Sequence, residues 1–216
     1  MFTFKAALQE MAESEIASMV DATRLADIKL HDPRPLIKVF VVGHEGESRG
    51  NLIGIGNVVK RWFRTMIHQL HEKVTTGLQL FSGHASGTND HLGRQQIGEV
   101  VGKALRTIDG RESVLVACYV RPDFKHLPLD VASVEIDVAI KPTGDGSVDI
   151  TGLGELTGIA LGNSAVNKPG FPGATLLGQL QAFEEEQRVK CGYPVGLRLG
   201  YGSNTNTIRL AKPEED

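Results

Sequence analysis

The segment from Asp130 to Ile140, DVASVEIDVAI, alternates residue by residue between an apolar and a more polar series. The apolar series is Ala132, Val134, Ile136, Val138 and Ile140. A repeat of two residues is the pattern of a β-strand with one buried face. Other β-rich segments lie between Gly77 and Leu161, separated by DG, RPD and TGDG turns. The chain is therefore expected to fold largely as short strands.

Three further segments are expected to be helical. Residues 3–28 and residues 56–74 carry apolar residues near helical spacing, and residues 174–190 follow a Gly/Pro-rich stretch. Together with the strands, they predict one α+β domain over residues 1–190, with its N-terminal helix at 3–28 and its core at 36–189. Residues 191–216 are expected to be a C-terminal tail that is either flexible or processed.

Composition narrows the class of protein. The chain has 216 residues, 41% of them hydrophobic, which is enough for one domain with a substantial core. Its 23 Lys and Arg against 26 Asp and Glu give a net charge of -3, so no positive field favours a nucleic-acid partner. Cys118 and Cys191 lie far apart, which favours a reducing compartment over a disulfide framework. No signal core or 18-residue apolar run is found, so a soluble protein that is not exported is expected.

Two motifs of nucleotide and metal sites are incomplete. The GIGNVV stretch lacks the third glycine of a dinucleotide fingerprint and the GK[ST] of a P-loop. His68 and His71 lie three residues apart, but HQLHE is not the HExxH pattern of a zinc protease. Neither a cofactor nor a metal is therefore expected.

The order of several short motifs carries a family resemblance. The β-rich segment GLQLFSGH ends on His84 and is followed by an IGEVVG strand, then by the strand that contains Ser133. The segment GLGELTGIAL and a Pro/Gly/Ala-rich patch come next. This order resembles the prohead maturation proteases of tailed phages, which share a fold with the herpesvirus assemblins. The resemblance covers about half of the chain and implies a mainly antiparallel, closed or nearly closed β-barrel surrounded by helices.

The resemblance also implies a catalytic triad. A serine hydroxyl attacks a carbonyl efficiently only when an imidazole takes its proton, and a third group holds that imidazole. Ser133 is the expected nucleophile and His84 the expected base, with His91 as the alternative base. Glu155 is the expected third member.

Several supporting assignments stay open at this point. Asp149 is the rival of Glu155, whose apolar neighbours favour its partial burial. Glu135 and Asp137 share the strand of Ser133 and are interpreted as solvated or substrate-facing. Backbone N–H groups of Gly158 or Gly162 are candidates for the oxyanion hole.

The function implied is a serine endopeptidase of procapsid maturation. Its expected substrates are the scaffold protein, the major capsid protein and itself, inside the assembling procapsid in the host cytoplasm. Dimerisation through helices is plausible by analogy with assemblins. The alternatives are a catalytically inactive assembly protein of the same fold and a small-molecule esterase. The esterase is disfavoured because no G-x-S-x-G motif surrounds Ser133.

Overall fold

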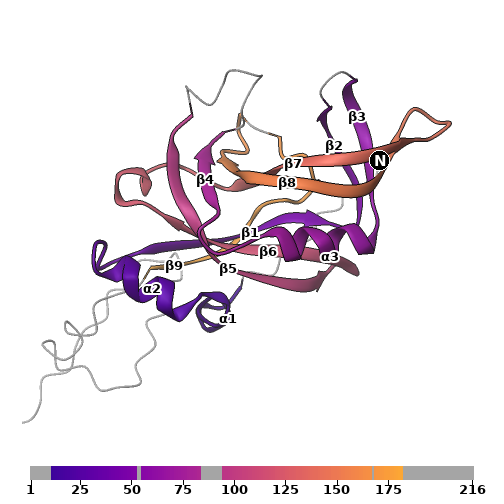
Figure 1. Ribbon diagram of the computed structural model, residues 1–216. Coiled ribbons are helices and arrows are strands. Elements are labelled where there is room, and N and C mark those ends of the chain that lie inside the picture. Colours follow the sequence, from indigo (N-terminus) through magenta and orange to yellow (C-terminus); the bar gives the residue numbers. More distant parts are fainter. Residues whose placement is uncertain (1–10, 53–54, 84–93, 167, 182–216) are drawn as a thin grey trace, which may run out of the picture. The chain divides into compact units, whose positions relative to one another are not determined.

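Nine strands form one hydrogen-bonded sheet in the part of the chain that the structure describes (Figure 1). The computed structural model describes residues 11–52, 55–83, 94–166 and 168–181. The strands are β1 (Leu36–His44), β2 (Gly46–Leu52), β3 (Gly56–Trp62), β4 (Gln79–Ser82), β5 (Gln96–Ile108), β6 (Arg111–Val120), β7 (Val131–Pro142), β8 (Val148–Gly162) and β9 (Leu176–Gln181). The strand predicted from the alternation at 130–140 is confirmed as β7.

The helices make the fold α+β, as predicted. They are α1 (Glu13–Met19), α2 (Ala22–Lys29) and α3 (Arg64–Lys73), with a short 3₁₀ turn η2 (Pro122–Phe124). None of the described helices is long and apolar enough to cross a membrane. The described residues belong to one compact unit, residues 1–183, and the predicted tail over 191–216 lies outside them.

The sheet is open, so the expectation of a closed barrel is corrected. Its strand order is β2-β3-β8-β4-β5-β6-β1-β9. Strand β7 lies outside this order and pairs with the edge of β8 that faces away from β3 and β4. Next to β9, the chain meets β7 at a single isolated bridge between Val131 and Thr175. The N–H of Ala132 also donates to the carbonyl of Ala174 at 3.2 Å. The described contact between these segments stops at the first residues of β7. No continuous ladder therefore joins β7 to β9, and the sheet does not close.

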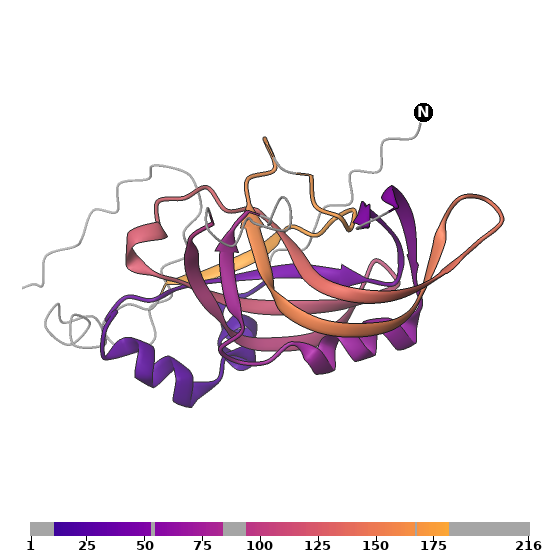
Figure 2. The ribbon, with the colours of Figure 1, turned by 45° about the horizontal axis from the view of Figure 1, so that its top comes forward.

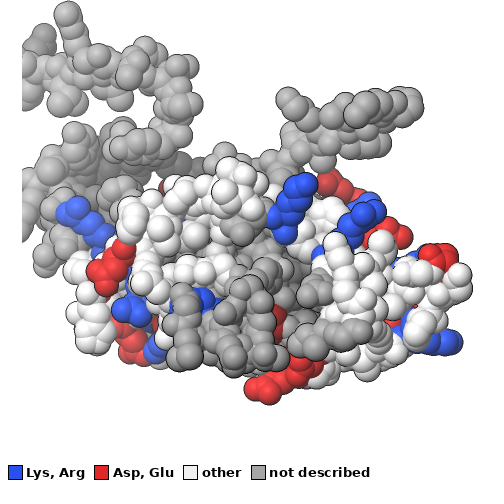
Figure 3. Space-filling view, turned by 90° about the horizontal axis from the view of Figure 1, so that it is seen from above, with Lys and Arg blue, Asp and Glu red and all other residues white. Residues whose placement is uncertain are grey.

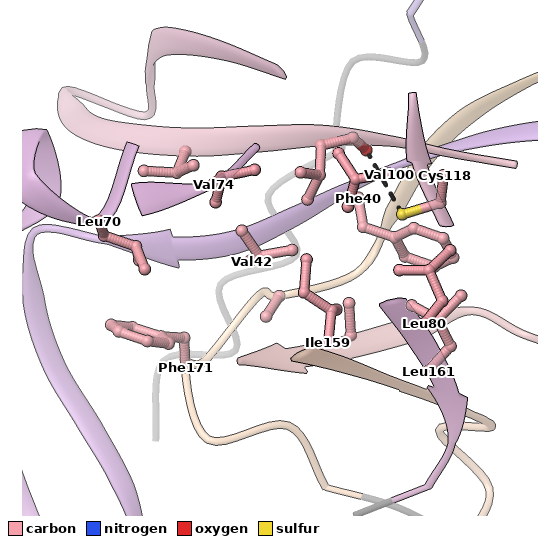
Figure 4. Close-up of a cluster of buried hydrophobic side chains, with 14 of the residues drawn as sticks. Phe40, Val42, Leu70, Val74, Leu80, Val100, Cys118, Ile159, Leu161 and Phe171 are labelled. Atoms are coloured by element: carbon pink, nitrogen blue, oxygen red, sulfur yellow. Dashed lines mark hydrogen bonds between the residues drawn. The ribbon is translucent and has the colours of Figure 1, made fainter. Parts of the chain in front are cut away.

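The long β7–β8 hairpin arches over β1, β5 and β6 (Figure 2). Apolar side chains from the hairpin and from the strands that it covers meet in one large cluster, which includes Phe40, Leu80 and Ile159 (Figure 4). Helix α3 adds Met66, Ile67 and Leu70 to this cluster. The sheet therefore has an inner face, which lines this core, and an outer face.

A second apolar cluster lies on the outer face of β1, β5 and β6. Residues of β6 alternate between the two clusters, with Val116 in the inner one and Leu115 and Ala117 in the outer one. Ile16 of α1 and Ile28 of α2 cover the outer cluster. Burial on both faces explains why β1 and β6 appear in the sequence as continuous apolar runs.

The predicted N-terminal helix over 3–28 is wrong in its length. Residues 1–10 lie outside the described part, and the remainder forms two helices separated at Val20 and Asp21. Val20 is extended and bridges Gly102 of β5, while the Asp21 carboxylate accepts from the N–H of Arg24 at 2.9 Å and caps α2. A Cβ at Gly102 would lie 2.0 Å from the carbonyl oxygen of Met19. Glycine therefore permits the close crossing that interrupts the helix.

The predicted helix over 56–74 is half strand. Residues 56–62 form β3, which pairs with β2 along its whole length, and only residues 64–73 are helical. The indole N–H of Trp62 donates to the Ser48 hydroxyl at 2.8 Å. Pairing with β2 outweighs the helical spacing of the apolar residues, because tertiary context overrides local pattern.

The predicted helix over 174–190 is also wrong where it is described. Residues 176–181 form β9, an antiparallel partner of β1, and residues 182–190 lie outside the described part. Leu177 packs into the outer cluster, and a Cβ at Gly178 would touch Ile16 at 3.1 Å. The open edge of β1 and the closeness of α1 select a strand at this position.

A buried polar cluster joins the segment after α2 to the end of β6. Asp32 accepts from the Lys125 ammonium at 2.8 Å and from the Tyr119 hydroxyl at 3.2 Å. Burial, and secondly the Asp32 carboxylate, raise the pKa of Tyr119 to about 12. Buried polar groups of this kind stabilise the fold only while their partners remain.

Candidate functional site

Ser133 lies on the outer face of the sheet, near the start of β7. Its neighbour Ala132 belongs to the inner core cluster, and the alternation of strand side chains points Ser133 to the opposite face. Ser133 is in register with Ala160 of β8, which is in register with Phe81 of β4. The Ser133 side chain is half-buried, and within the described residues its hydroxyl makes no hydrogen bond.

A small open pocket surrounds Ser133. It is lined by residues 131–133 of β7, residues 160–162 of β8, Gly83 and the pair Lys168–Pro169. Lys168 is the one charged residue of this lining, and most of the remaining surface is apolar. A serine hydroxyl beside such a pocket can meet a bound carbonyl compound.

Hydrogen bonds hold the turn that precedes β7, next to the pocket. The Asp130 carboxylate accepts from the Ser164 N–H at 2.6 Å and from the Ser164 hydroxyl at 2.5 Å. On the inner side, the Lys38 ammonium donates to the carbonyl of Leu129 at 2.9 Å. Burial lowers the pKa of Lys38, and the nearby Asp130 opposes this effect. The turn before β7 is thereby held to both β1 and the segment after β8.

The two candidate bases, His84 and His91, lie outside the described residues. The described residues on either side of that stretch are anchored beside the pocket. The N–H of Gly83 donates to the carbonyl of Leu161 at 2.9 Å, and the N–H of Ser82 donates to the carbonyl of Gln95 at 3.0 Å. His84 directly follows Gly83, a residue of the pocket lining, in the sequence.

Glu155 is exposed, so the expectation of its partial burial is wrong. It lies five residues before Ala160 on β8, about 17 Å along the strand at ~3.3 Å per residue. Asp149 lies further away, at the start of β8, and its Oδ1 is buried without a hydrogen-bond partner. The structure brings neither carboxylate to Ser133. The assignment of Glu155 as third member stays a prediction that this strand geometry does not favour.

Glu135 is the carboxylate that shares the face of Ser133. Its side chain is 12% exposed and pairs with Arg94, whose side chain is 7% exposed. Of the two interpretations of Glu135, solvated is therefore wrong, and substrate-facing stays a prediction. Asp137, two residues further, is exposed as expected. The guanidinium carbon of Arg94 stands 3.8 Å from the centroid of the Phe81 ring.

No pattern in the sequence predicts the position of Arg94 beside Glu135. A single arginine ahead of a strand carries no motif, and its partner Glu135 is 41 residues away. The carboxylate of Glu135 was the available signal, because a carboxylate that becomes buried requires a cation or hydrogen-bond donors nearby.

The two glycines considered for the oxyanion hole occupy different surroundings. Gly162 lines the pocket together with Ser133. Gly158 lies beneath the Phe81 ring, and a Cβ there would stand 2.7 Å from a ring carbon. Gly158 is therefore explained by packing, and Gly162 is the better placed of the two for a role beside Ser133.

The described charges on one surface of the molecule are mixed in sign. In the view of Figure 3, the described Lys and Arg side chains are interspersed with Asp and Glu and form no large patch of one sign. The described residues in this view therefore present no basic patch of the kind that binds a polyanion.

Comparison of the chain with protein-family models, with curated proteins and with solved structures gave no significant match.

Proposed function

We propose that this chain is a serine endopeptidase whose nucleophile is Ser133. The observation that carries the proposal is the position of its hydroxyl, half-buried at a pocket lined by Gly83, Gly162 and Lys168. A rigid strand aims the hydroxyl, as a nucleophile requires. The pocket also adjoins the residue that precedes His84, the proposed base.

The proposed reaction proceeds through an acyl-enzyme. The Ser133 oxygen attacks the carbonyl carbon of the scissile bond, and its proton moves to the imidazole of the base. Backbone N–H groups stabilise the negative charge on the carbonyl oxygen, for which Gly162 is our candidate. The imidazolium then gives its proton to the leaving amine. Water, activated by the same base, hydrolyses the ester and frees Ser133.

The proposed substrates are the scaffold and major capsid proteins of a phage procapsid, and the chain itself. This part of the proposal rests on the resemblance of the motifs around His84, Ser133 and Glu155. The small, open pocket supports a polypeptide substrate, because such a site buries too little of a small molecule to bind it well. The competing function is that of an inactive assembly protein of the same fold.

A fluorophosphonate probe tests the nucleophile without knowledge of the substrate. Attack by the serine oxygen on phosphorus breaks the P–F bond, releases fluoride and the hydroxyl proton, and leaves a stable phosphonate ester that mass spectrometry locates. We expect the adduct on Ser133, none in Ser133→Ala, and normal labelling in Ser18→Ala, whose exposed hydroxyl bonds within α1. His84→Gln should abolish labelling, whereas His91→Gln should retain most of it.

Self-cleavage distinguishes a protease from an esterase or an inactive assembly protein. The intact mass of the purified wild-type chain is expected to decrease with time, while that of Ser133→Ala stays constant. Equal labelling of Ser133→Ala and the wild type would refute Ser133 as nucleophile. An unlabelled, uncleaved wild-type chain would favour the assembly protein.

A further inference from the structure

The ion pair between Arg94 and Glu135 is the most buried of those among the described residues. Its side chains are 7% and 12% exposed, compared with 23% and 6% for Lys125 and Asp32 and 40% and 16% for Arg24 and Glu99. Removing two charges from water is unfavourable, and a pair of apolar side chains at such a place is often at least as stable. Fold stability therefore gives a weak reason for this pair.

Arg94 is also incompletely satisfied. Its Nε is one of two buried side-chain polar atoms without a hydrogen-bond partner in the described part of the chain. A buried donor without an acceptor is a further energetic cost. A costly, rigid arrangement on the outer face of a sheet indicates a role other than general stability.

The pair links three strands at the level of Ser133. Glu135 follows Ser133 by two residues and faces the same side, because the register from Val131 to Glu135 is regular. Gly158, in register with Glu135, lacks a side chain and leaves room for the Phe81 ring. Arg94 stacks on that ring and reaches Glu135 across β8.

Arg94 stands one residue before Gln95, which pairs with Ser82 at the end of β4. The Gln95 N–H donates to the Ser82 hydroxyl at 3.3 Å, in addition to the bond between the Ser82 N–H and the Gln95 carbonyl. We call the four residues Ser82, Gly83, Arg94 and Gln95 the stem. Both candidate bases lie between its two sides in the sequence. The Arg94–Glu135 pair connects this stem to the strand of the proposed nucleophile.

We propose that Arg94 is a positioning residue, which through Glu135 holds this stem in register with Ser133. The inference rests on the proposed function, since it concerns the same nucleophile. A base between Gly83 and Arg94 in the sequence must meet the Ser133 hydroxyl within hydrogen-bond distance. An error of about 1 Å in such a placement costs about a hundredfold in rate. The pair therefore acts on catalysis through geometry and does not touch the reacting atoms.

The test is the rate of fluorophosphonate labelling of Ser133 in full-length variants, measured where circular dichroism shows each to be folded. We expect Arg94→Met and Glu135→Gln to label about tenfold to a hundredfold more slowly than the wild type. Arg94→Lys, which keeps the charge, should recover part of the rate. The matched controls are Arg24→Met and Glu99→Gln, which break an Arg–Glu pair between α2 and β5 and should change labelling less than threefold.

The outcomes separate this inference from the proposed function. If Ser133 is labelled in the wild type at the same rate as in Glu135→Gln and both Arg94 variants, the positioning role is refuted and the nucleophile stands. If the wild type is not labelled at Ser133, both are refuted. Hydrogen exchange at the backbone N–H groups of Gln95 and Gln96 measures the anchoring of the stem independently of the labelling of Ser133. Faster exchange in Arg94→Lys supports the anchoring of the stem, and unchanged exchange in both Arg94 variants contradicts it.

Discussion

Replacing Gly158 by alanine is expected to destabilise the sheet beside Ser133. The new Cβ would stand 2.7 Å and 3.0 Å from two carbons of the Phe81 ring and 3.2 Å from the carbonyl oxygen of Gln79. Ordinary carbon contacts lie near 3.5–4.0 Å, so the ring must move by roughly 1 Å. The Gln79 carbonyl belongs to β4 and has little freedom to follow. Overpacking of this kind costs about 1–3 kcal/mol.

A matched substitution exists in the same strand. At Gly152 an added Cβ would meet Ala139 at 3.5 Å, which is an ordinary contact. Gly152→Ala is therefore expected to be neutral or to stabilise by about 0.4–1 kcal/mol, because alanine has less conformational freedom than glycine in the unfolded chain. The two variants carry the same substitution, glycine to alanine, and differ in the free space around the new Cβ.

Urea unfolding followed by the fluorescence of Trp62 measures both effects. Trp62 is the single tryptophan of the chain and is 4% exposed against Phe171. Adding Phe81→Leu to Gly158→Ala should return part of the lost stability, since the shorter side chain frees the space above Gly158. Equal stability of Gly158→Ala and Gly152→Ala, or additive effects of the double substitution, would refute this account of the packing.

Two further predictions concern the fold. Because the pKa of Tyr119 is raised to about 12 in the folded chain, from an ordinary value near 10, the unfolded chain loses this proton first as pH rises. Stability should therefore fall between pH 10 and 12 by up to about 2–3 kcal/mol in the wild type, and by less in Tyr119→Phe, as measured by urea midpoints at several pH values. An identical alkaline loss in Tyr119→Phe would exclude Tyr119 as its source. Asp21→Ala removes the cap of α2 and should cost about 1 kcal/mol, while Asp21→Asn should retain most of the stability; equal losses in both variants would show that the cap is unimportant.

Local pattern predicted the strands better than the helices. The alternation at 130–140 predicted β7, because each residue reports directly on the face that it occupies. The break of the N-terminal helix depends on a bridge from Val20 to Gly102, and the strand at 56–62 depends on pairing with β2. Both are contacts with other elements, which spacing within one segment does not report.

The expected partial burial of Glu155 is wrong because of the register of β8. Leu153 and Leu156, three residues apart, both pack against the inner core, which a regular strand would not allow. The β7–β8 ladder shifts register between Glu135 and Ile136 and again between Ile136 and Val138. Such bulges change which residues face the core, and they leave no periodic signal in the sequence. Apolar neighbours therefore gave a misleading indication of burial.

The distribution of polar groups over the two faces explains how a site can form on this sheet. The inner face is apolar and, on β1, β5 and β6, the outer face is covered by α1 and α2. The outer face of β4, β7 and β8 instead carries Ser133 and the Arg94–Glu135 pair. The Phe81 ring of β4 covers the pair, and Gly158 of β8 leaves room for that ring. The pair itself joins β7 to the segment before β5. Since these contributors pack directly against one another, a change at any one of them should alter the others. Gly158→Ala should therefore slow the labelling of Ser133 as well as destabilise the sheet.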